Sequence, residues 1–182
     1  DVYPSIDHSG DHLEALPNCV FHFPNYKRQR GNSVLGEIDR SLTDNTKLGN
    51  IVWFIGLPPS KHNDWRKKAI MEINRIPSGA KQIETSTLDY KEPLKHMQSE
   101  YEKRWDKSSI TITNLGSKMQ TIGIALFCIL HPDVRVMNAA PKRYNGKEFS
   151  SGHSKNWKIE FGNTAEIRQL LRSVGELKVV PR

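Results

Sequence analysis

Short β-rich runs alternate with segments of helical periodicity along this chain, and this alternation restricts its fold more than any other feature. Apolar or β-branched runs occur at 19–23, 50–56, 81–86, 109–114 and 134–140, with helix-length stretches between most of them. Strands that alternate with helices of about a dozen residues indicate βαβ units, whose crossovers are right-handed. We therefore predict an α/β fold with a Rossmann-like, mostly parallel sheet flanked by helices.

The helices are expected where apolar residues recur at helical spacing. Residues 33–42 form a weak case, because Gly36 interrupts the pattern, and the preceding segment 24–32 is expected to be a loop. Residues 62–76 are clearer, with Asn63 or Asp64 as the N-cap. Their expected buried stripe is Trp65, Ala69, Ile73 and Ile76. The next helix starts near Asp89, has Pro93 in its first turn, and buries Leu94, Met97, Tyr101 and Trp105.

Two strands are expected at the centre of the sheet, namely 50–56 and 134–140. The first is continuously apolar, as expected for a strand that helices cover on both faces. The strand at 109–114 alternates apolar residues with threonine instead. Either Thr111 and Thr113 face a polar cleft, or this strand lies near an edge of the sheet.

The chain is long enough for one well-buried core. Residues 1–16 show no periodicity, so we predict an extended lead-in or linker there and a single Rossmann-like domain over 17–182. The sequence begins with Asp1 rather than methionine, which predicts that it is part of a longer protein. A capped helix is expected at 163–175.

The charge of the chain predicts an anionic partner. Its 182 residues include 27 Lys and Arg against 20 Asp and Glu, a net charge of +7. No apolar run reaches the length of a membrane span, so no membrane association is expected. Two cysteines, without a disulfide framework or a metal-ligand spacing, favour a reducing, cytoplasmic location, no metal and no cofactor.

Candidate ligand contacts follow the predicted strands, because ligands of open α/β sheets bind beyond the carboxyl ends of the strands. The loops are 56–60, 85–89, 114–118 and 139–145. The candidate residues are Gly56 and Ser60; Thr85, Ser86 and Asp89; Asn114, Gly116, Ser117 and Lys118; and Lys142, Arg143 and Tyr144. Turn residues of this kind also occur where nothing binds.

Lys118 is the unusual member of this set. It falls in the first turn of an apolar helix, where the macrodipole disfavours a cation. The backbone amides of Gly116, Ser117 and Lys118 could bind an anion that the lysine then completes. Alternatively, the lysine extends into solvent or pairs with Asp89 or Glu84, which would make it structural.

The stretch from the strand at 109–114 through "NLGSKM" and the apolar helix to "HPDVRVMNAAP" resembles the signature region of CRISPR-associated Rossmann-fold sensor domains, the CARF superfamily. In those domains a Gly-Gly-Thr-Lys turn contacts cyclic oligoadenylate. The resemblance implies ligand contacts at Asn114, Gly116, Ser117 and Lys118 and a role in prokaryotic antiviral defence. This chain has one glycine in the turn and Ser117 in place of threonine.

We therefore predict a regulatory domain that senses a nucleotide-type anionic ligand and acts on a fused or associated effector domain, with a homodimer as one possible assembly. The first alternative is a nucleic-acid-binding or scaffolding subunit that uses Lys27, Arg28 and Arg30, in a segment expected to be exposed. The second is a phosphodiesterase or nuclease on the rim loops. Its candidate residues are Ser60, Asp89, Lys118, Arg143 and Tyr144, among which no acid–base pair at a suitable spacing stands out.

Overall fold

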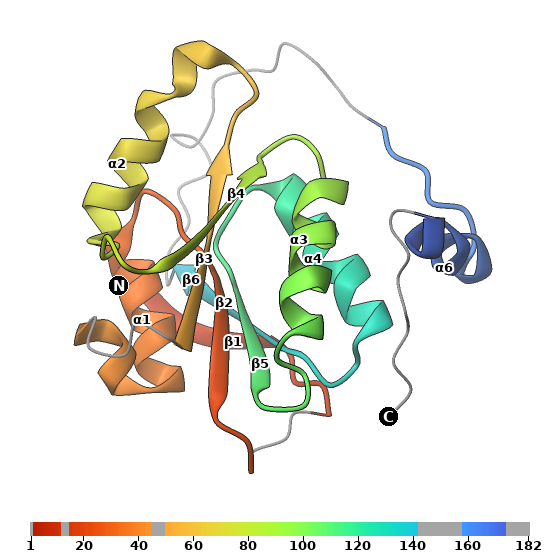
Figure 1. Cartoon of the computed structure of the whole chain (residues 1–182), viewed down its shortest axis with the longest axis horizontal. Helices are drawn as coiled ribbons and strands as arrows, with labels where there is room; N and C mark the ends of the chain where they lie inside the picture. Colours follow the sequence, from red (N-terminus) through yellow and green to blue (C-terminus); the bar gives the residue numbers. More distant parts are fainter. Residues whose placement is uncertain (1, 12–14, 45–49, 142–157, 174–182) are drawn as a thin grey trace.

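A six-stranded sheet forms the centre of the molecule (Figure 1). The computed structural model describes residues 2–11, 15–44, 50–141 and 158–173. The strands are β1 (Val2–His8), β2 (Asn18–Phe23), β3 (Ile51–Leu57), β4 (Lys81–Ser86), β5 (Ser109–Asn114) and β6 (Arg135–Pro141). All neighbouring pairs are parallel except β1 and β6, which are antiparallel. The predicted α/β fold with a mostly parallel, Rossmann-like sheet is confirmed.

The strand order is β1-β6-β5-β2-β3-β4. From β2 the chain moves outward through β3 to β4, then returns to the other side of β2 with β5 and continues to β6. The order therefore reverses between β2 and β5, which creates a topological switch point at their carboxyl ends. The prediction that β3 and β6 are the central strands is wrong, because each lies second from an edge and β2 and β5 occupy the middle.

The threonines of β5 face polar partners on β2 rather than solvent at an edge. The Thr111 hydroxyl donates to Asn18 Oδ1 at 2.9 Å, and Thr113 Oγ1 lies 2.5 Å from His22 Nδ1. Both threonines are fully buried. The alternation in this strand therefore reflects a polar seam inside the sheet, and the expectation of an edge strand is wrong.

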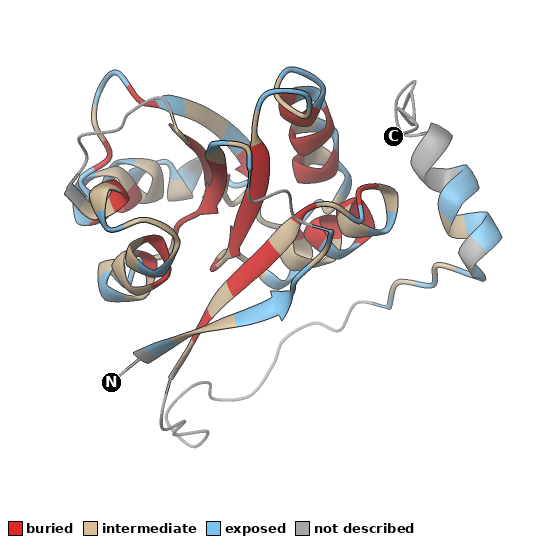
Figure 2. Ribbon diagram, turned by 90° about the horizontal axis from the view of Figure 1, so that it is seen from below, coloured by how far each residue is buried: buried red, intermediate tan, exposed pale blue. Residues whose placement is uncertain are grey.

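Helices cover both faces of the sheet. One face carries α1 (Arg28–Ile38) and α2 (Trp65–Asn74), and the other carries α3 (Lys91–Glu102) and α4 (Lys118–Leu130). Short 3-10 turns η1 (Arg40–Asp44) and η3 (Lys61–Asn63) precede β3 and α2, respectively. Figure 2 shows the buried strands between these two helical layers. Near the C-terminus lies α6 (Thr164–Ser173), which the Asn163 side chain caps as predicted.

Each face of the sheet has its own apolar core. On the α3 and α4 face, Phe21, Phe54 and Ile112 pack against helix residues such as Met97 and Phe127. On the opposite face, the core combines strand and helix side chains, among them Val20, Leu35, Trp53, Ile55 and Ile70. Alternate residues of β2 and β3 thus pack into opposite cores, which is why β3 is a continuous apolar run.

Three local predictions need correction. Residues 2–8 are not a linker, because β1 pairs with β6 along most of its length. The segment expected to be a loop becomes helical at Arg28, where α1 begins, and this helix packs against β1 and β6. Trp65 is 60 % exposed and Ile73 39 %, so the stripe of α2 is narrower than expected. Asp64 occupies the N-cap position of α2 without a capping side-chain hydrogen bond.

Candidate functional site: a cleft at the switch point

A cleft of about 290 Å³ opens at the carboxyl ends of the central strands. Its walls come from the loops after β2, β3, β4 and β5 and from the beginnings of α2 and α4. The lining residues are Pro24, Asn25, Tyr26, Gly56, Pro58, Arg66, Ile70, Thr87, Leu115, Gly116, Ser117 and Gln120. The cleft therefore lies at the switch point between β2 and β5, the usual ligand position in open α/β sheets. Gly56 and Gly116 lie on the same edge of the sheet, as predicted.

Gln120 joins the loops at the base of this cleft. Its side chain is 1 % exposed. Its Oε1 accepts from the Ser117 amide at 2.7 Å, and its Nε2 donates to Thr85 Oγ1 at 2.9 Å. The Ser117 hydroxyl in turn accepts from the Gln120 amide at 3.2 Å, which completes a capping box at the start of α4. One side chain thereby links β4 to the β5–α4 turn.

The position of the Gln120 side chain also explains why residues 56 and 116 are glycines. A Cβ atom on Gly116 would stand 2.3 Å from Gln120 Oε1, and one on Gly56 would stand 2.8 Å from Gln120 Nε2. Because the Gln120 amide is hydrogen-bonded at both ends, it has no free direction in which to yield. The backbone at Gly116 is therefore approached closely, as expected, but by the Gln120 side chain rather than by a ligand. The anion site expected on the Ser117 amide is likewise occupied by Gln120 Oε1.

Lys118 is the first residue of α4, and its side chain is exposed. It is not one of the residues that line the cleft. Within the described residues it forms no ion pair, and its expected partner Glu84 is paired with Lys67 instead. Of the two structural roles considered, extension into solvent and pairing with an acidic residue, the geometry agrees with extension into solvent.

The loop between β2 and α1 is a part of the site that the sequence analysis missed. Pro24, Asn25 and Tyr26 form one wall of the cleft, and Lys27 is the N-cap residue of α1. Asn25 Oδ1 accepts from the Lys27 amide at 2.7 Å, and the Asn25 carbonyl accepts from Asn74 Nδ2 at 2.9 Å. No side chain caps α1. In its first turn the Arg30 amide donates to the Lys27 carbonyl at 2.9 Å, and no residue of α1 itself lines the cleft. The start of α1 therefore lies next to the cleft through the Pro24–Tyr26 loop, near the position that a Rossmann-like fold uses for phosphate.

Arg66 is the only cationic side chain among the residues that line the cleft. Its Nε donates to Asn63 Oδ1 at 3.1 Å, and its guanidinium carbon lies 5.3 Å from the centre of the Trp65 ring. These two contacts leave the outer nitrogens of the guanidinium free to face an anion. Tyr26, 42 % exposed, adds an aromatic surface to the lining of the same cleft.

His22 lies in the sheet beneath the β2–α1 loop. Burial lowers the pKa of its imidazole to about 3. The ring contacts Trp53 edge-on at 4.8 Å, and its Nε2 lies 3.3 Å from the position that a Cβ on Gly31 would occupy. Gly31 therefore lets α1 approach β2 closely. The neutral imidazole belongs to the polar seam with Thr113 and does not reach the cleft as an acid or base.

The remaining candidate residues are dispersed around the rim. Ser86 Oγ accepts from the amides of Leu88 and Asp89, and Asp89 Oδ1 accepts from the Lys91 amide, so both organise the start of α3. Ser60 is exposed and Thr85 is buried under Gln120. Asn114 faces a different cavity, which is described below. Lys142, Arg143 and Tyr144 lie outside the described residues.

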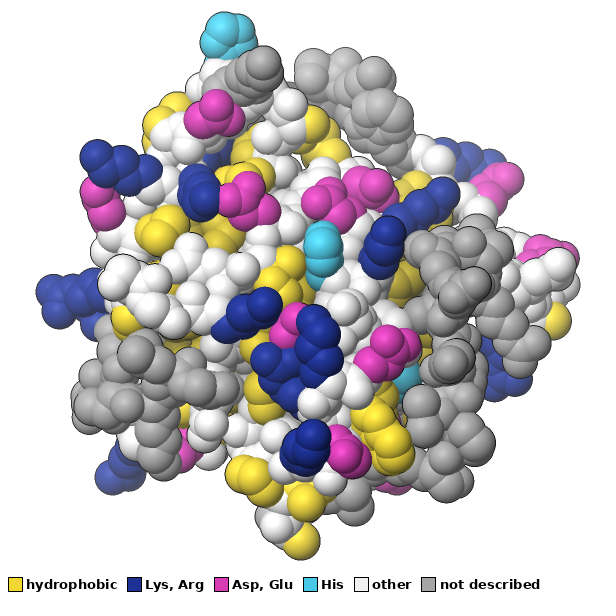
Figure 3. All heavy atoms as spheres, viewed as in Figure 1, with side chains coloured by type: hydrophobic (Ala, Val, Ile, Leu, Met, Phe, Trp, Pro, Cys, Tyr) yellow, Lys and Arg dark blue, Asp and Glu magenta, His cyan; other side chains and the backbone are white. Residues whose placement is uncertain are grey.

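The basic segment expected to be exposed is only partly so. Lys27 is exposed, whereas Arg28 and Arg30 are half-buried and the Nε atom of each is enclosed without a hydrogen-bond partner in the described structure. In Figure 3, basic and acidic side chains are interspersed over one face of the molecule, among the side chains drawn in colour. A broad surface of single sign, which would favour a nucleic-acid duplex, is not formed by the described residues of that face.

The described part of the chain contains no group of three or more His, Cys, Asp or Glu residues able to hold a metal ion. It also contains no helix long and apolar enough to cross a membrane. The chain matches no protein-family model, no curated protein and no solved structure. The resemblance to CARF sensor domains therefore rests on the motif residues alone.

Proposed function

We propose that this chain is a nucleotide-sensing regulatory domain that binds a phosphate-bearing ligand in the switch-point cleft. The main support is the coincidence of three features at one place. These are the reversal of strand order, the cleft-lining loop that leads into the uncapped start of α1, and Arg66 among the lining residues. An anion there meets backbone donors and a guanidinium together, a combination suited to phosphate.

The size of the cleft limits the ligand. A volume of about 290 Å³ is at the small end of ligand pockets, which span roughly 300–1,000 Å³. We therefore expect one nucleotide unit to occupy it, with its phosphate toward α1 and Arg66 and its base against the apolar side chains and Tyr26. A larger cyclic oligonucleotide would place only one of its units inside.

The test is isothermal titration calorimetry with AMP, ADP, ATP and cyclic tetra-adenylate, with adenosine as the unphosphorylated control. At least one phosphate-bearing ligand is expected to bind, and adenosine is expected to bind at least tenfold more weakly. Replacing Arg66→Gln removes the charge while keeping a polar, hydrogen-bonding side chain. This change should weaken binding by tenfold or more, about 1.4 kcal/mol.

Two matched variants control this experiment. Arg168→Gln removes a charge from the exposed surface of α6 and should leave affinity unchanged. Lys118→Met removes the cation on which the sequence analysis relied, and because Lys118 does not line the cleft, its effect should stay well below that of Arg66→Gln. If none of the phosphate-bearing ligands binds, or if Arg66→Gln binds as tightly as wild type, the proposal is wrong.

The nucleic-acid alternative predicts a different dependence on salt. A chain that lies on phosphates through Lys27, Arg28 and Arg30 should lose affinity with a slope of roughly one log unit per phosphate contact. We expect no such binding to single- or double-stranded RNA or DNA, because Arg28 and Arg30 are half-buried in α1. Steep salt-dependent binding in fluorescence anisotropy would favour the alternative.

A further inference from the structure

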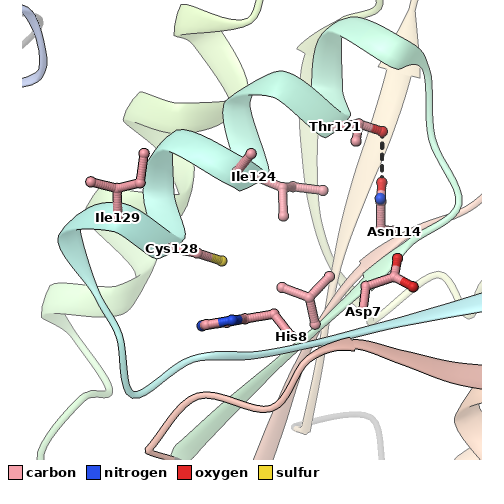
Figure 4. Close-up of a pocket in the computed structure, with 9 residues that line it drawn as sticks. Asp7, His8, Asn114, Thr121, Ile124, Cys128 and Ile129 are labelled. Carbon is pink, nitrogen blue, oxygen red and sulfur yellow. Dashed lines mark hydrogen bonds between the residues drawn. The ribbon is translucent and has the colours of Figure 1, made fainter. Parts of the chain in front are cut away.

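A second cavity lies away from the switch point, between the edge of the sheet and α4 (Figure 4). Its volume is about 410 Å³. It is lined by Asp7, His8, Asn114, Thr121, Ile124, Ala125, Cys128, Ile129 and Val136. None of these residues lines the switch-point cleft. The two cavities therefore form separate sites.

The cavity has a polar end. Figure 4 shows Asp7 and Asn114 at the same end of the cavity, which both residues line. The Thr121 hydroxyl donates to Asn114 Oδ1 at 2.8 Å and fixes the orientation of that amide. Asp7 is exposed and comes from β1, so its carboxylate reaches the cavity from the edge strand. An ionised carboxylate can accept several hydrogen bonds at once.

Apart from His8, the rest of the wall is apolar. Ile124, Ala125, Cys128 and Ile129 lie on one face of α4, and Val136 closes the cavity from β6. Figure 4 shows Cys128 and His8 at the end opposite to Asn114. Ala125 and Ile129 are exposed although the helix is apolar on nearly all sides. An apolar wall with a few polar groups at one end is typical of small-molecule sites.

The charge of the cavity is opposite to that of the protein. Among the described residues that line it, none is Lys or Arg, although the chain carries 27 of them. Asp7 contributes a carboxylate. Burial, together with the negative charge of Asp133, raises the pKa of the Cys128 thiol to about 12. An anionic ligand would meet the Asp7 carboxylate with no Lys or Arg in the lining to compensate it, and His8 lies at the opposite end of the cavity. An ammonium group would gain a charge-assisted hydrogen bond with Asp7.

We propose that this cavity is a second ligand site, which takes a small amphipathic amine. The ammonium group donates to the Asp7 carboxylate beside Asn114, and the aromatic or branched aliphatic body lies along Ile124, Ala125 and Val136. The site selects against carboxylates and phosphates of the same shape. It is independent of the nucleotide proposal, because the cleft and the cavity share no lining residue.

Cys128 provides a direct reporter of occupancy. The experiment measures the rate at which methyl methanethiosulfonate, a thiol-selective reagent that amines do not consume, modifies Cys128 in the intact chain. The readout is peptide mass spectrometry at a mildly alkaline pH that leaves the amine probe protonated, with buried Cys19 as an internal monitor of unfolding. The probes are 2-phenylethylamine, 2-phenylethanol and 3-phenylpropionate. We expect the amine to slow labelling of Cys128 at least fivefold at saturation, the alcohol to act only at higher concentration, and the carboxylate to have no effect.

Variants separate the proposed contacts from general effects. Asp7→Asn should raise the half-protecting concentration of the amine at least fivefold, whereas Asp11→Asn, an exposed neighbour outside the cavity, should not change it. Ala125→Trp fills the cavity from an exposed helix position and should abolish protection while the urea midpoint stays near that of wild type. Equal protection by 3-phenylpropionate, no protection by the amine, or an unchanged response in Asp7→Asn would each overturn the proposal.

Discussion

The buried imidazole of His22 should make the fold sensitive to mild acid. Its pKa of about 3 in the folded chain lies below the ordinary value of 6.5, because burial disfavours the charged ring. As the pH falls, the unfolded chain therefore takes up the proton before the folded chain does. The contribution of the neutral His22 ring to the free energy of unfolding is fully present well above pH 6.5. It is lost progressively between pH 6.5 and about pH 3.

The size of this effect follows from the two pKa values. Each pH unit inside the window is worth up to about 1.4 kcal/mol, so lowering the pH from 7 to 5 should reduce the free energy of unfolding by about 2 kcal/mol through His22 alone. Ordinary carboxylates remain ionised over most of this range. The other histidines also titrate within it, so the contribution of His22 has to be isolated by a variant.

His22→Asn is that variant, because the asparagine amide can replace Nδ1 as the partner of the Thr113 hydroxyl. Urea denaturation of wild type and variant at pH 7, 6 and 5 gives the free energy of unfolding at each pH. The variant should be less stable at pH 7, since it leaves space next to Trp53 and Gly31. Between pH 7 and pH 5 the free energy of unfolding of the variant should fall by about 2 kcal/mol less than that of wild type. Parallel pH profiles of the two proteins would refute the argument.

Further stability predictions concern Gln120, Glu100 and Lys118. Gly116→Ala should cost about 1–3 kcal/mol in urea denaturation, since its Cβ would displace the doubly bonded Gln120, whereas Gly79→Ala, with open space around it, should be nearly neutral. Glu100→Gln should cost about 1–3 kcal/mol, because the buried carboxylate pairs with three cations. Burial alone would raise the pKa of Glu100, but Lys103 and Arg104 outweigh it and hold this pKa below 4.5. The Glu100 contribution is therefore present above pH 4.5 and lost below it. Lys118→Met should leave the melting temperature equal or slightly higher, since it removes an exposed cation, worth about 0.3–1 kcal/mol, from the start of α4.

The sequence was sufficient for the fold class because its main evidence is local. Apolar runs and helical stripes report burial directly, and they located β3, α3 and α4 correctly. Strand order is not local, since it depends on which helices can pack together. Thr111 and Thr113 were ambiguous for that reason, because their partners on β2 are about 90 residues away along the chain.

Some of the residues that line the cleft were predicted to lie together. Collecting the residues that follow each strand correctly brought Gly56, Gly116 and Ser117 together, but the loop after β2 was left out of that set. The same rule applied to that strand would have found Asn25 and Tyr26. The spacing of Ser117 and Gln120 is a capping-box pattern that the sequence already contained. The bridge from Gln120 to Thr85 needs the tertiary structure, because the two residues lie on different elements.

The most direct test of the proposed site is a titration of ¹⁵N-labelled protein with ADP, followed by NMR. The account predicts that the largest amide shifts fall on Tyr26, Gly56, Thr87 and Gly116, which line the cleft, and that adenosine at the same concentration produces much smaller ones. Substitution of Arg66→Gln should reduce these shifts. Shifts centred on the cavity beside Cys128, shifts of equal size with adenosine, or no shifts at millimolar ADP would contradict a phosphate-binding cleft at the switch point.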